Sequence, residues 1–254
     1  MKSLLKRKRV DFLVVGVQKA GTSALSEYLN NHASLQMASK KEVHFFNKEK
    51  HFKDGNPNYK KYHKFFDWTD RSKVYGEVTP IYFYWTNACQ RIWEYNPRMK
   101  IVAILRNPIH RAYSHWGMER QRGREFKDFG FSIRNERERA RTELPFQHQQ
   151  FSYVDRGFYA DQVRRYQRYF PDEQLLFIKY EDFRSDQVGS LKQIFKFIGV
   201  SAKDFDYSYK EKRKTKFKTK ISDKDKEYLL ECYRGDILSL EHILGWDCSD
   251  WLAV

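Results

Sequence analysis

The chain has 254 residues, which suits one α/β domain with a full hydrophobic core and leaves little room for a second domain. Its 48 Lys and Arg against 33 Asp and Glu give a formal net charge of +15, which attracts polyanions in general without identifying one. The cysteines Cys89, Cys232 and Cys248 are odd in number and lack metal-ligand spacing. They therefore imply neither a disulfide framework nor a zinc site, and they indicate structural thiols in a reducing compartment.

The N-terminus combines a basic extension, residues 1–9, with an apolar run. This order is typical of a signal peptide, but Asp11 and Gln18 interrupt the apolar residues and no small-residue cleavage site follows. No run approaches the length of a transmembrane helix. We therefore expect a cytoplasmic protein without a membrane anchor.

A predicted strand at residues 11–16 ends in the turn Gly16-Val-Gln-Lys-Ala-Gly-Thr-Ser23. Its two glycines allow the backbone to approach an anion, and the following helix turns its partly positive N-terminus to the same place. A nucleotide-binding P-loop has its lysine at the position of Thr22, whereas Lys19 lies inside the turn. This position suits the bridging oxygen of a short phospho-anhydride better than a γ-phosphate. The alternative is a structural glycine turn with a solvated lysine.

A second polar turn follows a predicted strand at residues 100–105. Arg106 comes at the end of this strand, Asn107 is a helix-capping residue, and Pro108 suits the first helical position. Asn107, Arg111 and Ser114 then fall on one face of the helix. A guanidinium and a hydroxyl can bind one phosphate dianion together, so the sequence predicts a second anion site. A salt-bridged arginine and a solvated serine are the alternatives.

The remaining pattern predicts a parallel sheet covered by helices on both faces. Helical stretches at residues 23–31 and 188–198 carry apolar residues on one side, which we expect to be buried. They alternate with strands predicted near residues 11–16, 74–78, 100–105 and 174–179.

Three charged segments lie outside this pattern. Residues 51–68 mix basic and aromatic side chains, which favours an aromatic-anchored surface insertion, with nucleic-acid binding as the alternative. Residues 120–141 predict a solvated helix or lid with many ion pairs, and the lysine run at 210–220 is typical of a solvated loop.

The two turns together resemble the cofactor signatures of the PAPS-dependent sulfotransferases, where PAPS is 3′-phosphoadenosine 5′-phosphosulfate. The segment Lys41-Glu-Val-His-Phe-Phe46 resembles the Glu-x-x-Phe-Phe element of the heparan-sulfate-type branch, and the end of the chain, from Tyr233 to Trp251, is similar to that of bacterial members. The resemblance runs from Asp11 to about Trp251 and thus covers nearly the whole chain.

The resemblance implies an α/β sulfotransferase that takes PAPS as sulfate donor, releases PAP (adenosine 3′,5′-bisphosphate) and needs no metal. It implies that Glu42 is the catalytic base, with His44 as the competing base, and that Lys19 stabilises the leaving oxygen. The implied cofactor-binding residues are Lys19, Ala20, Gly21, Thr22 and Ser23 for the 5′-phosphosulfate, Arg106 and Ser114 for the 3′-phosphate, and Lys216 and Lys218 in a basic loop over that phosphate.

One departure concerns the acceptor. Heparan-type members often carry a lysine after the glutamate of a Glu-Lys-Ser/Thr segment, and Val78 takes that place here. This departure argues against a second leaving-group lysine and against the acidic-polysaccharide acceptor of that branch. Since no membrane anchor is expected, the resemblance implies a soluble bacterial enzyme that sulfates a hydroxyl of a carbohydrate or small natural product, or an amine or guanidine nitrogen. The prediction is a single domain, residues 1–254, with acceptor-site insertions or a lid at 47–73 and 120–150.

Two other function classes stay open. A small-molecule or nucleotide kinase would use the glycine turn, but no convincing magnesium-binding carboxylate follows an apolar strand. A basic nucleic-acid-binding protein would use the net charge, but no known module signature accompanies it.

Overall fold

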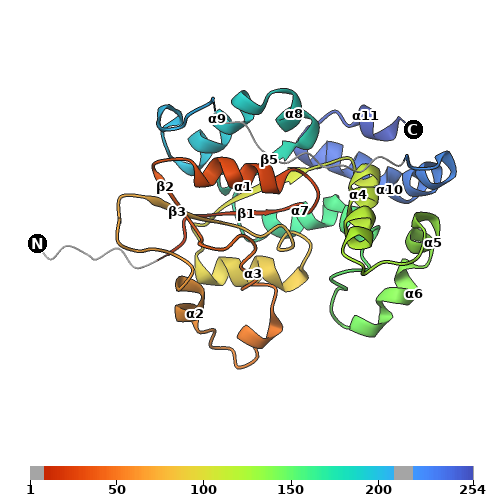
Figure 1. Ribbon diagram of the computed structural model, residues 1–254, viewed down its shortest axis with the longest axis horizontal. Coiled ribbons are helices and arrows are strands. Elements are labelled where there is room, and N and C mark those ends of the chain that lie inside the picture. The colour runs from red at the N-terminus through yellow and green to blue at the C-terminus, as the bar shows by residue number, and fades with distance from the viewer. Residues whose placement is uncertain (1–8, 209–219, 254) are drawn as a thin grey trace, which may run out of the picture. The chain divides into compact units, whose positions relative to one another are not determined.

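Five strands form the central sheet in the order β2-β3-β1-β4-β5 in the computed structural model, which describes residues 9–208 and 220–253 (Figure 1). β1 pairs in parallel with β3 and β4, and β2 pairs in parallel with β3. The predicted α/β fold with a central parallel sheet is therefore confirmed. The strands are β1 (Phe12–Gly16), β2 (Leu35–Met37), β3 (Val74–Val78), β4 (Lys100–Leu105) and β5 (Leu175–Lys179).

β1 occupies the centre of the sheet, and every one of its residues is buried. Its register sets Phe12 opposite Gly76 of β3, and a Cβ at Gly76 would overlap the Phe12 ring. Glycine at this position therefore lets the two strands approach each other around a large side chain. The strand order reverses at β1, and ligands of open α/β sheets bind outside the carboxyl ends of the strands at such a point.

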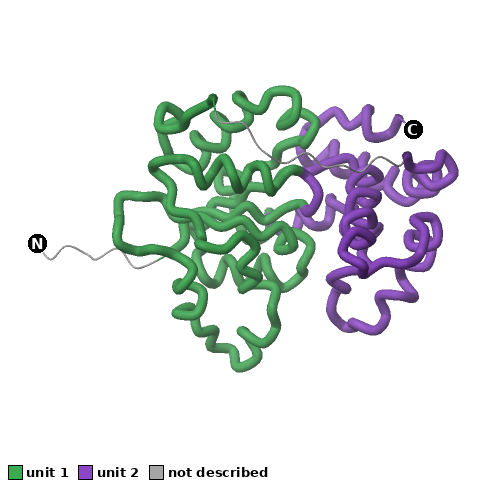
Figure 2. The backbone as a smooth tube through the Cα atoms, in the orientation of Figure 1, with its two compact units in different colours: residues 1–17, 21–104, 167–212 green, residues 18–20, 105–166, 213–254 purple. Residues whose placement is uncertain are grey.

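The chain divides into two compact units (Figure 2). Unit 1 comprises residues 1–17, 21–104 and 167–212 and contains most of the sheet. In this unit α1 and α3 lie on opposite faces of the sheet (Figure 1). Its helices are α1 (Thr22–Asn30), α2 (Tyr59–His63), α3 (Thr86–Tyr95), α8 (Tyr180–Ser185) and α9 (Gln187–Ile198).

Unit 2 comprises residues 18–20, 105–166 and 213–254. Within it α4 packs against α5 and α10, and α10 also packs against α11. Its helices are α4 (Pro108–Gln121), α5 (Phe129–Arg134), α6 (Glu136–Ala140), α7 (Tyr159–Gln167), α10 (Asp223–Leu244) and α11 (Ser249–Leu252). Single 3-10 turns in the two units lie at Glu49–His51, Arg141–Glu143, Asp155–Gly157, Asp172–Gln174 and Ala202–Asp204.

The aromatic side chains of residues 51–68 pack inward. Tyr62 is fully buried, and its ring centroid lies 5.1 Å from that of Phe46 and 5.3 Å from that of Phe66. Lys60, Lys61 and Lys64 of the same segment are exposed. The predicted aromatic anchoring with a basic outer side is confirmed, and the role of this segment as an insertion stays a prediction.

The prediction for residues 120–141 is wrong in part. They form the end of α4, then α5, α6 and connecting turns instead of one solvated helix, and Glu125 within them is only 2% exposed. No helix in the described part of the chain combines the length and the apolar character that a membrane crossing requires.

Candidate active site

The turn after β1 contributes residues 18–20 to unit 2 and residues 21–23 to unit 1. In unit 1, Gly21 caps α1 with a left-handed backbone, φ 78° and ψ 7°. The first helical hydrogen bond runs from Leu25 N to Gly21 O, 3.1 Å, so the amides of Thr22 and Ser23 have no acceptor within the helix. Together with the two hydroxyls they form a set of donors suited to an anion.

In unit 2 the two predicted anion-binding motifs contact each other. The Arg106 guanidinium donates from Nη1 to the carbonyl oxygen of Lys19 over 2.9 Å. Lys19 has a left-handed backbone, φ 76°, which turns the chain sharply at this point, and both residues are half-buried. Two cationic residues that are distant in the sequence therefore stand together at one turn.

Residues that the sequence analysis did not select hold this turn in place. The buried Arg156 donates to Gln18 Oε1 over 2.7 Å, and the Tyr159 hydroxyl donates to Arg106 O over 2.8 Å. Asp236 of α10 in turn accepts from Tyr159 N over 2.7 Å. The available signal was the segment Arg156-Gly-Phe-Tyr, in which an arginine comes three residues before the tyrosine that begins α7.

The helix cap of the second predicted motif is confirmed. Asn107 accepts from Ile109 N and His110 N, and Pro108 takes the first helical position, as predicted. Arg111 is fully buried and donates to Tyr153 O. Its common anion-binding face with Ser114 stays a prediction. Ser114 lies in the middle of α4 and is half-buried.

The two candidate bases form a pair in unit 1. His44 Nε2 lies 3.4 Å from Glu42 Oε2, and His44 Nδ1 lies 3.2 Å from Asn47 Oδ1. Both candidate bases have a left-handed backbone, φ 59° for Glu42 and 57° for His44, so this segment is not an extended strand. The side chains meet because the turn folds them together, and not because they alternate on a strand.

Glu42 is held in its ionised form by its neighbours. The hydrogen bond from His44 is the largest influence, and the nearby Lys41 ammonium adds to it, so the pKa of Glu42 falls to about 2 although burial opposes this change. The side chain is 36% exposed. A carboxylate that is charged and reachable at neutral pH can accept a proton from a group beside it.

A buried carboxyl fixes the strand end next to this turn. Glu77 of β3 is fully buried and accepts from the hydroxyls of Tyr62, Thr79 and Tyr82 over 2.5, 2.5 and 2.9 Å. Burial raises the pKa of Glu77. The Tyr82 hydroxyl also accepts from Phe45 N over 2.8 Å, so the Glu77 network is tied to the turn that carries Glu42 and His44.

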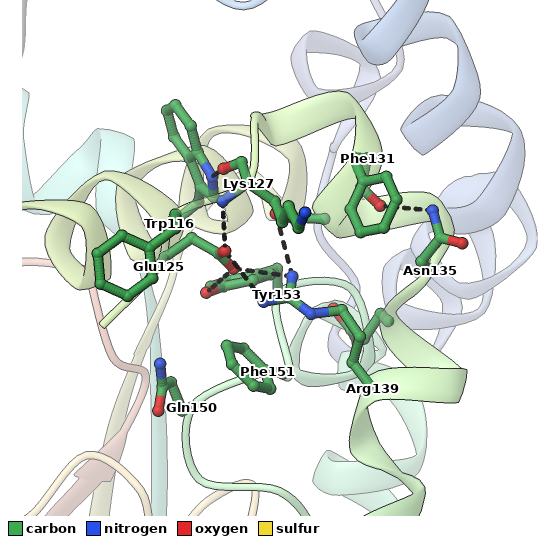
Figure 3. Close-up of polar contacts among 12 residues, drawn as sticks. Trp116, Glu125, Lys127, Phe131, Asn135, Arg139, Gln150, Phe151 and Tyr153 are labelled. Carbon is green, nitrogen blue, oxygen red and sulfur yellow. Dashed lines mark hydrogen bonds and ion pairs between the residues drawn. The ribbon is translucent and has the colours of Figure 1, made fainter. Parts of the chain in front are cut away.

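Glu125 is the centre of a polar network in the predicted lid of unit 2 (Figure 3). Its carboxylate accepts from Arg139, 2.8 Å, from the Tyr153 hydroxyl, 2.9 Å, and from Lys127 N, 2.9 Å. The Arg139 guanidinium also lies over the Phe151 ring, 3.8 Å from its centroid. One ion pair, hydrogen bonds and a ring contact thus connect Glu125, Arg139, Phe151 and Tyr153.

The described part of the chain does not test the predictions about Lys216, Lys218 and the absence of a metal. Lys216 and Lys218 lie outside the described part of the chain. Among residues 9–208 and 220–253, no three His, Cys, Asp or Glu side chains stand together as a metal site would require. The absence of a metal from the reaction stays a prediction.

Residues 9–231 match the family model of the sulfotransferase domain. The chain belongs to the sulfotransferase family. This sulfotransferase is 30% identical over 201 residues to human heparan sulfate glucosamine 3-O-sulfotransferase 6, covering 77% of this chain and 54% of the relative. It is 32% identical to human bifunctional heparan sulfate N-deacetylase/N-sulfotransferase 3 over 74% of this chain and 22% of that protein. The chain thus spans about half the length of these relatives or less.

Solved structures of sulfotransferases have a similar fold. A sulfotransferase from Alicyclobacillus acidocaldarius superposes with a TM-score of 0.84 at 28% identity, covering 96% of this chain and 99% of that chain. The sulfotransferase domain from the curacin biosynthetic pathway matches with a TM-score of 0.54 at 14% identity, over 77% of this chain and 76% of that chain, and shows the fold alone. The resemblance seen in the motifs is confirmed, and the chain is an enzyme of the EC 2.8.2 type. The family uses PAPS and yields PAP.

Proposed function

We propose that this sulfotransferase moves a sulfuryl group from PAPS to a hydroxyl of a carbohydrate or small natural product, with Glu42 as the base. The arrangement of Glu42 supports the proposal most strongly. Its carboxylate is ionised, its amide is tied to the end of β3 by a hydrogen bond to Val78 O, 2.9 Å, and Lys41 links it to Ser23 in the first turn of α1. A proton acceptor therefore stands beside the predicted phosphosulfate turn.

The side chains of both motifs suit a multiply charged anion. Thr22 and Ser23 offer hydroxyls and backbone amides in unit 1, and Lys19 and Arg106 offer two cations in unit 2. PAPS would supply the sulfuryl group: the bond from sulfur to the acceptor oxygen forms while the bond from sulfur to the bridging oxygen breaks, and PAP leaves with that electron pair. Thr22 and Ser23 would hold the 5′-phosphate, and Arg106 and Ser114 would hold the 3′-phosphate, with Lys216 and Lys218 assigned to the same phosphate.

Each catalytic residue has one task in this proposal. Glu42 accepts the hydroxyl proton as the acceptor oxygen attacks sulfur. Lys19 stabilises the negative charge that develops on the bridging oxygen. His44 fixes the orientation of Glu42 through its contacts with Glu42 and Asn47. We prefer this orienting role for His44 over the role of competing base.

The acceptor class rests on the relatives and on the insertions. One relative is named for heparan sulfate glucosamine and another for heparan sulfate, a carbohydrate. These names favour a sugar hydroxyl, with an amine or guanidine nitrogen as the alternative acceptor atom. Residues 47–73 and 120–150 are proposed as the acceptor-site insertions or lid of a single sulfotransferase domain. A cytoplasmic location in a bacterium also belongs to this proposal.

Calorimetry tests the donor class. We expect PAP to bind tightly without added metal, and ATP with magnesium and a single-stranded oligonucleotide to bind weakly or not at all. Tight magnesium-dependent binding of ATP would favour the kinase alternative, and tight binding of the oligonucleotide would favour a nucleic-acid-binding protein.

Substitution of Glu42 tests the base. Glu42→Gln removes the proton-accepting charge but keeps the size of the side chain, so sulfate transfer should fall by at least about 100-fold while the Kd for PAP changes little. Transfer from radiolabelled PAPS to a panel of sugars and alcohols provides the measurement. Glu94→Gln, an exposed change on α3, is the matched control. Wild-type turnover by the Glu42→Gln variant would remove Glu42 as the base.

A further inference from the structure

Lys41 links the predicted base to the predicted donor turn within unit 1. Its ammonium lies 2.9 Å from Ser23 Oγ and 3.1 Å from Glu42 Oε1, and its side chain is 30% exposed. Neither anion-binding motif includes Lys41. A single cation thus contacts both the first turn of α1 and the carboxylate of the base.

The end of β3 supplies no cation at this place. Val78 is 2% exposed, and its carbonyl oxygen accepts the hydrogen bond from Glu42 N. The side chains that lower the pKa of Glu42 are His44 and Lys41, and His44 also interacts electrostatically with the buried Glu77 of β3. Lys41 is therefore the cation beside Glu42 that also reaches the start of α1.

An ammonium group has three N–H donors, and the contacts with Ser23 and Glu42 use two of them. Helix N-termini are typical anion-binding sites, and the Ser23 hydroxyl lies at the N-terminus of α1. An ammonium already in contact with that hydroxyl can bind an oxygen of the anion by a small rotation of its flexible stem.

We propose that Lys41 binds a sulfuryl oxygen of the donor and is shared between that oxygen and the carboxylate of Glu42. This inference rests on the proposed function, because it requires a phosphosulfate at the start of α1. In its contact with Glu42 the ammonium favours the ionised carboxylate. Once the Lys41 ammonium turns toward a sulfuryl oxygen, it stabilises the ionised carboxylate of Glu42 less. The pKa of Glu42 then rises, and Glu42 becomes a stronger base as the acceptor hydroxyl arrives.

A comparison of two nucleotides separates this role from that of a structural ion pair. PAPS carries the sulfuryl group and PAP does not, while the rest of the two molecules is the same. We expect Lys41→Met to raise the Kd for PAPS about tenfold and the Kd for PAP less than about twofold, measured by calorimetry at neutral pH. Lys41→Arg should recover part of the preference for PAPS because it keeps the charge.

Lys40→Met is the matched control, because Lys40 is the exposed neighbour of Lys41 in the sequence. It should change both Kd values equally little. A second readout is the pKa of Glu42 in carbon-labelled protein, with the signal assigned by its loss in Glu42→Gln. PAPS should raise this pKa and PAP should not, and in Lys41→Met the pKa should be raised without nucleotide.

The outcomes distinguish this inference from the proposed function. If the wild-type protein binds neither nucleotide, both are wrong. If the wild-type protein binds both nucleotides, and Lys41→Met weakens the binding of PAP and PAPS equally or changes neither Kd, the proposed role of Lys41 is wrong and the proposed function stands.

Discussion

At the scale of single residues, Arg156 joins separate segments of unit 2. Besides Gln18, its guanidinium donates to Ser152 Oγ over 2.8 Å and to Gln149 O over 2.6 Å, and the residue is 3% exposed. Gln18 precedes Lys19, while Gln149 and Ser152 border the predicted lid. A buried arginine with three acceptors fixes geometry that a lysine cannot reproduce, because the planar fork sets the direction of each bond.

Arg156→Lys should therefore affect the turn at Lys19 more than it affects folding. We expect the Kd for PAP to rise about tenfold and the free energy of unfolding to fall by about 1–3 kcal/mol, because two acceptors lose their donor. Calorimetry and urea denaturation measure the two quantities. Gln18→Ala, which removes one acceptor and keeps Arg156, should weaken PAP binding with a smaller loss of stability. Unchanged PAP binding in both variants would contradict this role.

Single site residues were only partly accessible from the sequence. Lys19, Arg106 and Glu42 stand in recognisable motifs because the chemistry of strand ends and glycine turns is local. Lys41 and Gln18 lie in the same motifs, but their contacts depend on left-handed turns at Glu42 and Lys19 that the sequence pattern does not reveal. The roles assigned to all of these residues stay predictions.

At the scale of elements, the start of α1 depends on the backbone of Gly21. A residue with a Cβ would have to adopt the left-handed backbone of Gly21, φ 78°, and its Cβ would lie 3.2 Å from Tyr180 Cε2. L-residues with side chains adopt this conformation at a cost of about 1–2 kcal/mol. The glycine therefore fixes the direction in which the first amides of α1 point.

Gly21→Ala should lower the free energy of unfolding by about 1–2 kcal/mol and also weaken PAP binding. Gly55→Ala is the matched control, since Gly55 has a similar φ of 68° in an exposed loop and a Cβ there would meet no atom within 4 Å. The control should lose a similar amount of stability in urea denaturation and keep its affinity for PAP. Equal affinities for PAP in the two variants would show that Gly21 has no specific role in PAP binding.

Elements with a clear apolar pattern were predicted well, and some elements without one were not. The strands at 12–16, 74–78, 100–105 and 175–179 and the helices α1 and α9 follow apolar runs or helical spacing over several residues. β2 has three residues, Leu-Gln-Met, too few for a periodic pattern. In residues 120–141 the charge density suggested solvation, but tertiary contacts with Arg139 and Tyr153 bury Glu125, which no local pattern indicates.

At the scale of the whole molecule, buried carboxyls link stability to pH. Burial raises the pKa of Glu136 from its ordinary 4.5 to about 7, although the amides of Val154 and Asp155 donate to it over 2.7 and 2.8 Å. Burial likewise raises the pKa of Asp236 to about 6. The folded chain therefore favours the protonated forms. Their contribution to stability is complete below about pH 4 and is lost as the pH rises through about 6 and 7.

The Glu136 share of this dependence can be measured by substitution. Glu136→Gln cannot titrate, so its free energy of unfolding should fall less between about pH 5 and pH 8 than that of the wild-type protein, by up to about 3 kcal/mol. Urea denaturation at several pH values gives the slopes. Glu138→Gln, an exposed change on the same helix, should keep the wild-type slope. A wild-type slope in Glu136→Gln would show that Glu136 does not titrate in this range.

The left-handed backbone at Glu42 and His44 bears on how this protein can evolve. Each of these residues occupies a conformation that glycine or asparagine would adopt more easily, so the turn is less stable than another sequence could make it. Drift toward greater stability would replace the two side chains that the proposed chemistry requires. Selection for activity must therefore act continuously on this turn, and a descendant released from that selection should lose it early.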